Sequence, residues 1–333
     1  MRRTELTLAQ IAEWHNVCAA ATRAARGKRD RASVTEFMDD FECSVQRVRQ
    51  ALLLARLPVG EYRRFSIRDP KPRVIHAAPF ADRVAQHALM NWLEPVLDRW
   101  QIDTSFACRR GKGVHAAVRY AQRQCRRAAI VVKLDISGYF EHIDHVVLRA
   151  QLRRRVKGAG VLRLIDAILA SYCSAPGKGL PIGALCSQHF ANTYLTPADR
   201  YAMLQPETVA HCRIMDDTLL WCCSLADARR LVRGYRQFAA ETLSLQIKKP
   251  VIQRVVHGIS FCGYRIYPHQ LKPGRRRLRN ARKRREYWER QWLDGRIDSA
   301  TLQRNTDAVS AIVLPASLPH HAYQAQQSLV HEA

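Results

Sequence analysis

The sequence lacks several features that would place it in a familiar class. Its ten cysteines form no C-x-x-C pair, so neither a disulfide framework nor a structural zinc site is predicted. We interpret them as reduced core residues of a cytoplasmic protein. Nothing matches the G-x-x-x-x-G-K-[ST] phosphate-binding loop, although a basic, glycine-bearing loop lies within residues 107–122. The chain also shows no internal repeat and no low-complexity linker.

Long apolar runs and acidic residues are scarce as well. The N-terminal stretch MRRTELTLAQIAEW has no apolar segment typical of a secretory signal, and no later run approaches the length of a membrane span. The chain has 29 Asp and Glu against 54 Lys and Arg, a net charge of +25. Such an excess favours a polyanionic partner, either nucleic acid or an acidic membrane surface. Because no span is predicted, we expect nucleic acid as the partner and a cytoplasmic location.

The patterns that are present predict a folded α+β protein. With 333 residues, of which 47% are apolar, the chain has room for two or three subdomains. Helical and strand-like periodicities alternate along it. We expect helices near 5–25, 35–57, 79–93, 142–173, 187–204 and 225–243. We expect strands near 61–69, 129–135, 211–215 and 218–223, and a strand or strand pair at 259–268.

The stretch RIMDDTLLW carries the clearest chemical signal. It places Asp216 and Asp217 between two short apolar runs at hairpin spacing, so we expect both aspartates at the tip of a hairpin. Adjacent carboxylates repel unless a cation lies between them, and magnesium prefers such ligands. A third carboxylate, Asp135, ends the separate apolar run AIVVKLD. Three aspartates on neighbouring strands can hold two metal ions for in-line displacement at phosphorus. The alternative is a tight turn whose aspartates only satisfy backbone groups.

The letters MDD also occur at 38–40, in a segment with helical periodicity and many polar positions. There we expect Asp39 and Asp40 to face solvent, because a charged run on a helix usually forms a solvated face. The tripeptide alone is therefore not a site, and only its context distinguishes the two copies.

Taken in order, these segments resemble the reverse transcriptase family from residue 10 to about 290. KLDISGYFEHIDH (133–145) and RIMDDTLLW resemble the two catalytic motifs, with Ile214 where the family usually has tyrosine. LSLQIKK (243–249) resembles the lysine motif, ISFCGYRI (259–266) the primer grip, and RDPKPRVIHAAPFADRVAQHAL (68–89) a fingers segment.

The resemblance implies a right-hand polymerase fold. Its fingers would lie in residues 1–125 and its palm, an antiparallel sheet with helices, in 126–265 with fingers elements interleaved. A short, basic helical thumb and a C-terminal tail would occupy 266–333.

The resemblance also implies roles for individual residues. Asp135, Asp216 and Asp217, with the backbone of Ile136, would hold two Mg²⁺ ions, for which Mn²⁺ is an expected substitute. Lys248 or Lys249 would protonate the pyrophosphate. The incoming dNTP would contact Lys71, Arg73, Phe140, Ile182 and Gly183. Phe140 would exclude a ribose 2′-hydroxyl, and its alternative is an ordinary core phenylalanine. The alternative for Lys71 and Arg73 is a solvated basic turn.

Template RNA and the RNA/cDNA duplex would lie along the palm and thumb. The segment 272–290 has ten Lys and Arg among nineteen residues, and such a helix favours salt-sensitive phosphate contacts. An acidic protein partner, or a solvated helix without a partner, are the alternatives for this segment. The template and primer contacts that the resemblance implies are Ser187, Gln188, Met215, Phe261, Cys262, Gly263, Tyr264, Arg275, Arg276, Arg277, Lys283 and Arg284.

LPIGALCSQ (180–188) indicates a subtype. It reads I-G-x-x-x-S-Q where many reverse transcriptases read Q-G-x-x-x-S-P, and this is similar to the enzymes of diversity-generating retroelements. That subtype implies mutagenic retrohoming from a template-repeat RNA in a bacterium or phage, with a small, basic, oligomeric accessory protein. It also implies errors opposite adenine, because Ile182 cannot donate a hydrogen bond near the nucleotide.

Other interpretations of the sequence stay open. The enzyme could belong to a retron, a phage-defence system or a truncated group II intron. A catalytically inactive RNA-binding protein of the same fold is the alternative from another class. Ile182 could also be an ordinary apolar anchor of its loop.

Overall fold

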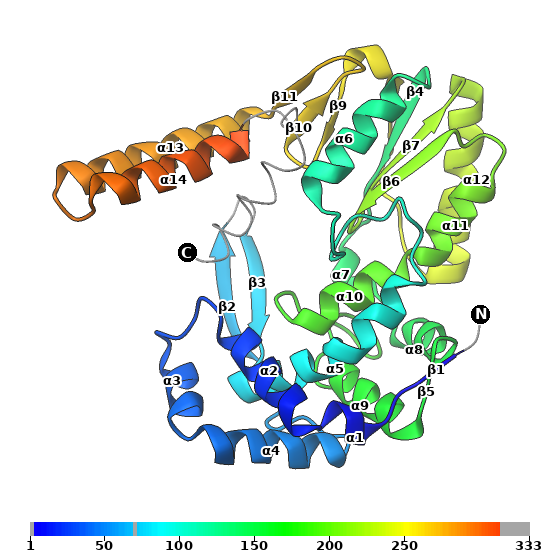
Figure 1. Ribbon diagram of the computed structural model, residues 1–333. Coiled ribbons are helices and arrows are strands. Elements are labelled where there is room, and N and C mark those ends of the chain that lie inside the picture. Colours follow the sequence, from blue (N-terminus) through cyan, green and yellow to red (C-terminus); the bar gives the residue numbers. More distant parts are fainter. Residues whose placement is uncertain (1–2, 69–71, 314–333) are drawn as a thin grey trace.

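The computed structural model describes residues 3–68 and 72–313 (Figure 1). Its centre is a four-stranded antiparallel sheet in the order β6-β7-β4-β8. The strands are β4 (Ile130–Leu134), β6 (Ala210–Ile214), β7 (Asp217–Cys222) and β8 (Val251–Arg254). The expected palm sheet is thus present, with β6 and β7 forming the predicted hairpin.

Helices cover both faces of this sheet, which explains why the two central strands, β4 and β7, are mostly apolar and buried. Val131, Leu219 and Trp221 pack with helix α6 (Val114–Cys125) on one face. Val132 and Leu220 belong to the larger core on the other face, with α12 (Leu225–Leu243). Figure 1 shows α6 on one side of the strands and α11 (Thr196–Leu204) with α12 on the other.

The N-terminal part is a helical layer that carries a two-stranded ribbon. Two sequence expectations are corrected here: the helix expected at 5–25 is divided near Ala12, and the one at 35–57 is divided at Asp40 and ends at Leu53. The first division follows from a local cap, since the side chain of Glu13 accepts from Asn16 N. At Asp40 the backbone leaves the helical conformation without a side-chain cap bond. The elements are β1 (Thr4–Glu5), α1 (Leu8–Ile11), α2 (Trp14–Ala25), α3 (Ala32–Asp39), α4 (Phe41–Leu53), β2 (Arg63–Arg68), β3 (Pro72–Ala77) and α5 (Phe80–Asp98).

Short helices connect this layer to the sheet, and β5 pairs in parallel with β1. The elements are α7 (Tyr139–His142), α8 (His145–Arg153), β5 (Val156–Lys157), α9 (Ala159–Ala170) and α10 (Leu185–Tyr194). One hydrophobic core runs through these helices, the N-terminal helices and one face of the sheet. The sheet edge and the helical layer are therefore packed as one unit.

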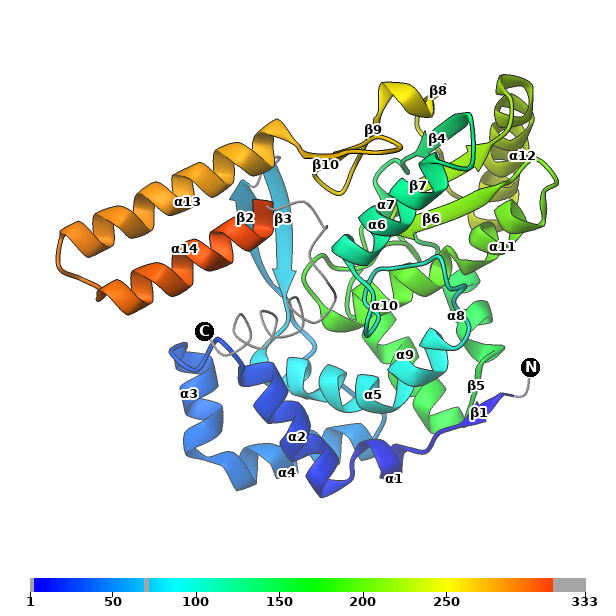
Figure 2. The ribbon, with the colours of Figure 1, turned by 45° about the horizontal axis from the view of Figure 1, so that its top comes forward.

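The C-terminal part is a three-stranded sheet followed by a helical hairpin. These elements are a short 3-10 helix (Val255–His257), β9 (Ile259–Phe261), β10 (Tyr264–Ile266), β11 (Leu271–Pro273), α13 (Arg275–Leu293) and α14 (Ser299–Val313). Residues 259–268 thus form a strand pair, one of the two alternatives that the sequence left open. Figures 1 and 2 show α13 and α14 extending away from the sheet, on the side where the β2–β3 ribbon also extends.

Two expectations about composition can be compared with the structure. The ten cysteines are all free; four are buried, but Cys43, Cys173 and Cys223 are exposed, so the expected core location holds for only part of the set. Within the described residues, no helix combines the length and the apolar character needed to cross a membrane.

Candidate active site

The β6–β7 hairpin presents the two aspartates differently. Ile214 pairs with Asp217, so Met215 and Asp216 form the two-residue turn and Asp217 is the first residue of β7. This corrects the expectation that both aspartates lie at the tip. Met215 has a φ of +52°, as two-residue hairpin turns require. Because Asp216 lies in the turn and Asp217 begins a strand, their side chains leave the hairpin in different directions.

Asp135 reaches the same edge from β4. Leu134 pairs with Thr218, which places the residue after β4 beside the start of β7. Burial raises the pKa of the Asp216 carboxyl, and the nearby Asp135 carboxylate adds to the rise, while Lys248 opposes it. Two of the three predicted carboxylates are therefore brought together at the end of the sheet.

Lys248 is the lysine of its motif that reaches this edge. Its backbone N donates to Asp135 O at 2.9 Å, and its Nζ donates to Asp135 Oδ2 at 2.9 Å. Lys248 and Lys249 are both exposed, so the contacts to Asp135 and not exposure distinguish them. The geometry favours Lys248 as the functional lysine, and its role in proton transfer stays a prediction.

Asp217 makes an ion pair of its own. Lys133 Nζ lies 3.0 Å from Asp217 Oδ2 and also donates to Ser260 O at 2.9 Å. The other oxygen, Asp217 Oδ1, is buried and has no hydrogen-bond partner. Burial raises the pKa of the Asp217 carboxyl to about 6, although Lys133 pulls it down. An acceptor in this state is suited to a cation.

These residues fit a divalent metal. Asp135 and Asp216 supply hard carboxylate oxygens, the orphaned Asp217 Oδ1 is a further acceptor, and the backbone carbonyl of Ile136 lies next in the chain. Within residues 3–68 and 72–313, however, no three His, Cys, Asp or Glu side chains gather as a metal-holding cluster. The third ligand therefore stays a prediction.

The structure reveals a buried network under the turn that the sequence interpretation missed. Arg213, on β6, has no exposed surface, and neither has Asp199 of α11, to which it is bound through two hydrogen bonds. Burial alone would raise the pKa of Asp199, but Arg213 and His211 hold it below its usual value. The available signal was a charged residue in the middle of the apolar strand HCRIM, which calls for a buried partner.

The predicted nucleotide-binding residues are only partly described. Phe140, on α7, packs against the main core and its ring meets Tyr139 edge to face. Ile182 O accepts from His76 N of β3 at 3.1 Å, and Gly183 has a φ of +109° with its Cα facing Ile75. The Ile182–Gly183 loop thus contacts the ribbon. Lys71 and the side chain of Arg73 lie outside the described residues.

Two predicted template contacts lie on α10. Ser187 is buried, whereas Gln188 is exposed and its Oε1 lies 3.7 Å from Cys108 Sγ. Of this pair only Gln188 presents its side chain to the surface. Ser187 sits in the first turn of the helix, within the core contacts of α10.

The primer-grip residues form the turn between β9 and β10. Cys262 and Gly263 both have positive φ, and Gly263 O accepts from Gly274 N at 2.8 Å. Phe261 and Tyr264 are buried beneath the turn, and the Arg277 guanidinium lies 4.2 Å from the centre of the Tyr264 ring. A cleft opens between this turn and α13. This thumb cleft is lined by Cys262, Gly263, Arg276, Arg277, Asn280, Ala281, Lys283, Arg284 and Val309.

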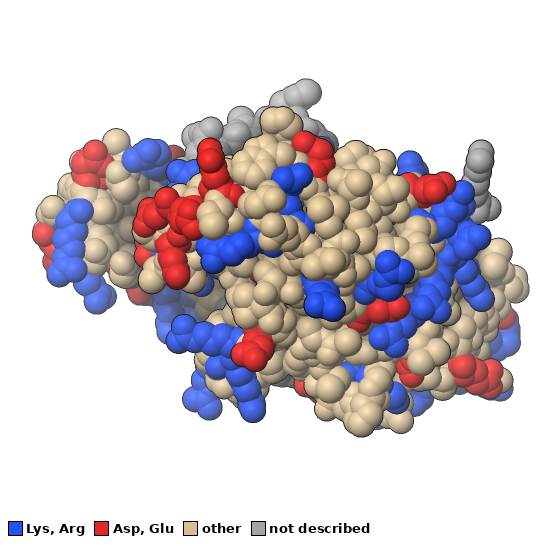
Figure 3. Space-filling view, turned by 90° about the horizontal axis from the view of Figure 1, so that it is seen from below, with Lys and Arg blue, Asp and Glu red and all other residues tan. Residues whose placement is uncertain are grey.

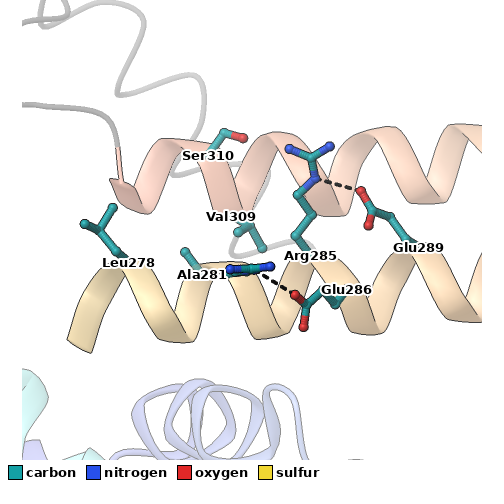
Figure 4. Close-up of a pocket in the computed structure, with 8 residues that line it drawn as sticks. Leu278, Ala281, Arg285, Glu286, Glu289, Val309 and Ser310 are labelled. Carbon is teal, nitrogen blue, oxygen red and sulfur yellow. Dashed lines mark hydrogen bonds and ion pairs between the residues drawn. The ribbon is translucent and has the colours of Figure 1, made fainter. Parts of the chain in front are cut away.

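The two sides of α13 differ in how their charges are used. Along α13, Arg282 and Arg285 pair with Glu286 and Glu289 at 2.9 and 2.7 Å. Figure 4 shows Arg285 and Glu289 pointing toward α14. The four basic residues of the thumb cleft recur at helical spacing on another side. Arg275 lies at the start of the helix. On the face shown in Figure 3, by contrast, Lys and Arg are scattered and interspersed with Asp and Glu.

The second MDD copy behaves as expected. Asp39 and Asp40 are exposed, and Asp40 Oδ2 pairs with Arg47 at 3.3 Å on the surface. This copy is thus an exposed helix boundary, whereas the turn at 215–217 is half-buried.

The chain is similar to several known proteins. The profile of the family described as reverse transcriptase (RNA-dependent DNA polymerase) matches residues 68–266. Protein YkfC of Escherichia coli strain K12 is 24% identical over 321 residues, covering 80% of this chain and 83% of that protein. The group II intron-encoded protein LtrA of Lactococcus lactis subsp. cremoris is 29% identical over 139 residues, covering 40% of this chain. The chain spans only 23% of LtrA.

Solved structures agree in fold alone. Apo telomerase from Candida tropicalis superposes with a TM-score of 0.51 at 11% identity, covering 82% of this chain and 61% of that chain. The α+β right-hand polymerase fold expected from the sequence is confirmed.

Proposed function

Because the chain belongs to the reverse transcriptase family, we propose that it copies RNA into DNA by adding dNTPs to a primer 3′ end. The observation that carries the proposal is the convergence of Asp135 and Asp216 from β4 and the β6–β7 turn, with Asp217 beside them. Nucleotidyl transfer needs clustered carboxylates at an open edge, where a primer terminus and a triphosphate can meet.

The active-site residues divide the work among them. Asp135, Asp216, the free oxygen of Asp217 and the Ile136 carbonyl would hold Mg²⁺, which when bound neutralises phosphate charge and acidifies the 3′-hydroxyl. Lys248 Nζ donates to Asp135 Oδ2 at 2.9 Å. In this proposal that bond holds Nζ next to the reacting phosphates. From there Lys248 can hand a proton to the departing pyrophosphate, as a positioned general acid does.

The nucleotide would lie between α7 and the Ile182–Gly183 loop. The bond from His76 N to Ile182 O ties that loop to the ribbon. Lys71 and Arg73 are the further contacts that we propose for the triphosphate. Phe140 would present its ring to the sugar and leave no space for a 2′-hydroxyl. Arginine suits bidentate contact with phosphate.

The duplex would run past the thumb cleft. Its four basic residues lie on the side of α13 that contacts the primer-grip turn, rather than on the side paired with glutamates. Phosphate contacts of this kind are independent of sequence and weaken as salt rises. Ser187, Gln188 and Met215 are the proposed contacts on the palm side.

A primer-extension assay tests the polymerase proposal. The wild-type protein is given Mg²⁺, four dNTPs and a DNA primer annealed to either an RNA or a DNA template of the same sequence. We expect cDNA on the RNA template, with little extension when NTPs replace dNTPs. Phe140→Ala should admit NTPs. An RNA-binding protein without catalysis would retain the duplex and extend neither primer.

We further propose the retroelement subtype, with errors concentrated opposite template adenine. The support is the I-G-x-x-x-S-Q pattern and the half-buried, apolar Ile182 where a hydrogen-bonding glutamine would improve discrimination. A small basic accessory protein and a template-repeat RNA, in the cytoplasm of a bacterium or a phage-infected cell, belong to this proposal. Sequencing of cDNA made by wild type and Ile182→Gln tests it. An unchanged error spectrum in the variant would show that Ile182 does not cause the errors opposite adenine.

A further inference from the structure

The proposed chemistry leaves the most deeply buried charge near the site without a role. Arg213 lies on β6, two residues before the turn residue Met215, and its exposed fraction is 0%. A guanidinium in such a position is very costly unless every donor finds an acceptor. An apolar side chain at this position of β6 would avoid the free-energy cost of burying a charge. The contacts of Arg213 therefore indicate what this residue does.

We propose that Arg213 is a positioning residue that holds the Met215–Asp216 turn in the conformation that brings Asp216 to Asp135. The inference rests on the polymerase function proposed above, since it concerns the geometry of the same site. Arg213 itself is buried beneath the turn and acts through the backbone of Met215.

The hydrogen bonds of the guanidinium account for all of its donors. Nε and Nη2 donate to the two oxygens of Asp199 at 2.7 and 2.6 Å. Nη2 also donates to Asn192 O at 3.0 Å, and Nη1 donates to Asn192 Oδ1 at 2.7 Å. The remaining Nη1 hydrogen goes to Met215 O at 2.9 Å. Five N–H groups thus meet five acceptors, four on helices and one in the turn.

Met215 needs such an anchor. Its φ of +52° lies in the left-handed region, which is unfavourable for a residue with a Cβ. The bond from Arg213 fixes the carbonyl of this residue, and that carbonyl is part of the peptide that leads into Asp216. Holding the peptide therefore fixes where the Asp216 carboxyl begins.

The other end of the network is rigid. Asn192 Nδ2 donates to Gln101 Oε1 at 2.6 Å and to Ala107 O at 2.8 Å, so its side chain has one orientation. The backbone of Arg213 is held as well, because its N donates to Thr104 O and its O accepts from Phe106 N, both at 2.9 Å. The guanidinium thus connects the turn to residues of α10 and α11 whose positions are fixed by other contacts.

Arg213→Lys tests this connection, because lysine keeps the charge opposite Asp199 but has too few donors for the other contacts. We expect kcat for single-dNTP incorporation to fall about 100-fold, as small misplacements of catalytic groups do. KM for dNTP and Kd for the duplex should stay within about threefold, because the loss is confined to the transition state. Leu231→Ala, in the buried core of α12, is the control for lost stability. It should lower the melting temperature without lowering kcat per folded molecule.

A rescue separates positioning from mere stability. Met215 is also a proposed template contact, so Met215→Gly alone is the reference. Glycine adopts a positive φ without strain, so adding Arg213→Lys to Met215→Gly should cost about tenfold in kcat rather than about 100-fold, a recovery of about tenfold. A network that only stabilises the fold would show no such recovery. An Arg213→Lys variant with the same kcat per folded molecule as Leu231→Ala would overturn the proposal, and so would an equal loss of kcat from Arg213→Lys in the wild-type and Met215→Gly backgrounds.

Amide hydrogen exchange keeps the inference testable apart from activity. In Arg213→Lys, exchange at 213–218 should rise while exchange at 130–134 stays as in wild type; unchanged exchange in the turn overturns the proposal. If Arg213→Lys does not fold, Asn192→Leu, which leaves the Asp199 pair intact, should show the same pattern. Wild-type protein that makes no cDNA rejects the proposed function, and the exchange comparison still decides the role of Arg213.

Discussion

Replacement of Asp217 by asparagine should make the metal-free protein more stable and the enzyme inactive. Burial raises the pKa of this carboxyl from 3.8 to about 6, against the pull of Lys133. A shift of about 2 units corresponds to about 3 kcal/mol, at about 1.36 kcal/mol per unit. Because the side chain is 30% exposed, solvent screening reduces the expected gain to about 2 kcal/mol.

The gain has a defined pH window. Because the folded state raises the pKa, the protonated carboxyl is the favoured form. The contribution of Asp217 to stability is therefore full below pH 3.8 and is lost as the pH rises through about 6. Asparagine resembles the protonated form at every pH. The advantage of Asp217→Asn should be largest above pH 7, shrink through about pH 6 and vanish below about pH 4.

Thermal unfolding of both proteins in EDTA from pH 4 to pH 8 measures this difference. At about 2–4 °C per kcal/mol, the variant should melt several degrees higher at pH 8. Added Mg²⁺ should narrow the gap, because a cation compensates the buried negative charge of Asp217 in the wild type. Lys133 keeps its bond to Ser260 O in the variant, so its loss of a partner is only partial. A variant that melts at or below the wild-type temperature across this range would show that burial of the Asp217 carboxylate does not destabilise the metal-free protein.

Three further predictions follow from the same contacts. Lys248→Met should lower kcat about 100-fold or more, as loss of a general acid does, and Lys249→Met should cost far less, in single-turnover assays. Alanine at the four basic residues of the thumb cleft should reduce the slope of log K for the duplex against log salt by up to about 3. Alanine at Arg282 and Arg285, which pair with glutamates, should change that slope less. Burial lowers the pKa of His87 to about 4, so its contribution to stability is full above pH 6.5 and is lost as the pH falls toward 4. His87→Gln should flatten the acid side of the melting profile.

Local patterns were enough to predict the central hairpin and its aspartates. Two apolar runs at hairpin spacing and a third run ending in Asp135 specify strands that must pair through buried faces. The order of the motifs then predicted the fold. The position of Asp217 could not be predicted, because spacing alone allows the turn to fall at 215–216 or at 216–217. The choice depends on the left-handed conformation of Met215.

Long-range contacts explain the rest of what the sequence did not show. Arg213 is bound to Asp199 and Asn192, which are 14 and 21 residues away in the chain, and no local periodicity identifies such partners. The division of the helix at Asp40 has a similar cause, since the two halves pack separately against α5 around Phe37 and Val48. Which of the two lysines contacts the site also depends on tertiary structure, through the bond from Lys248 to Asp135.

The central claim is that carboxylates at the β4–β7 edge carry out RNA-templated DNA synthesis. It is tested most directly by Mg²⁺-dependent incorporation of one dNTP opposite a defined RNA template base. Wild type, Asp216→Asn and Asp39→Asn are compared at equal folded concentration. Asp39 is the matched control, since it lies in the exposed MDD copy. We expect full incorporation by wild type and Asp39→Asn and none by Asp216→Asn. Incorporation by Asp216→Asn at the wild-type rate would contradict it.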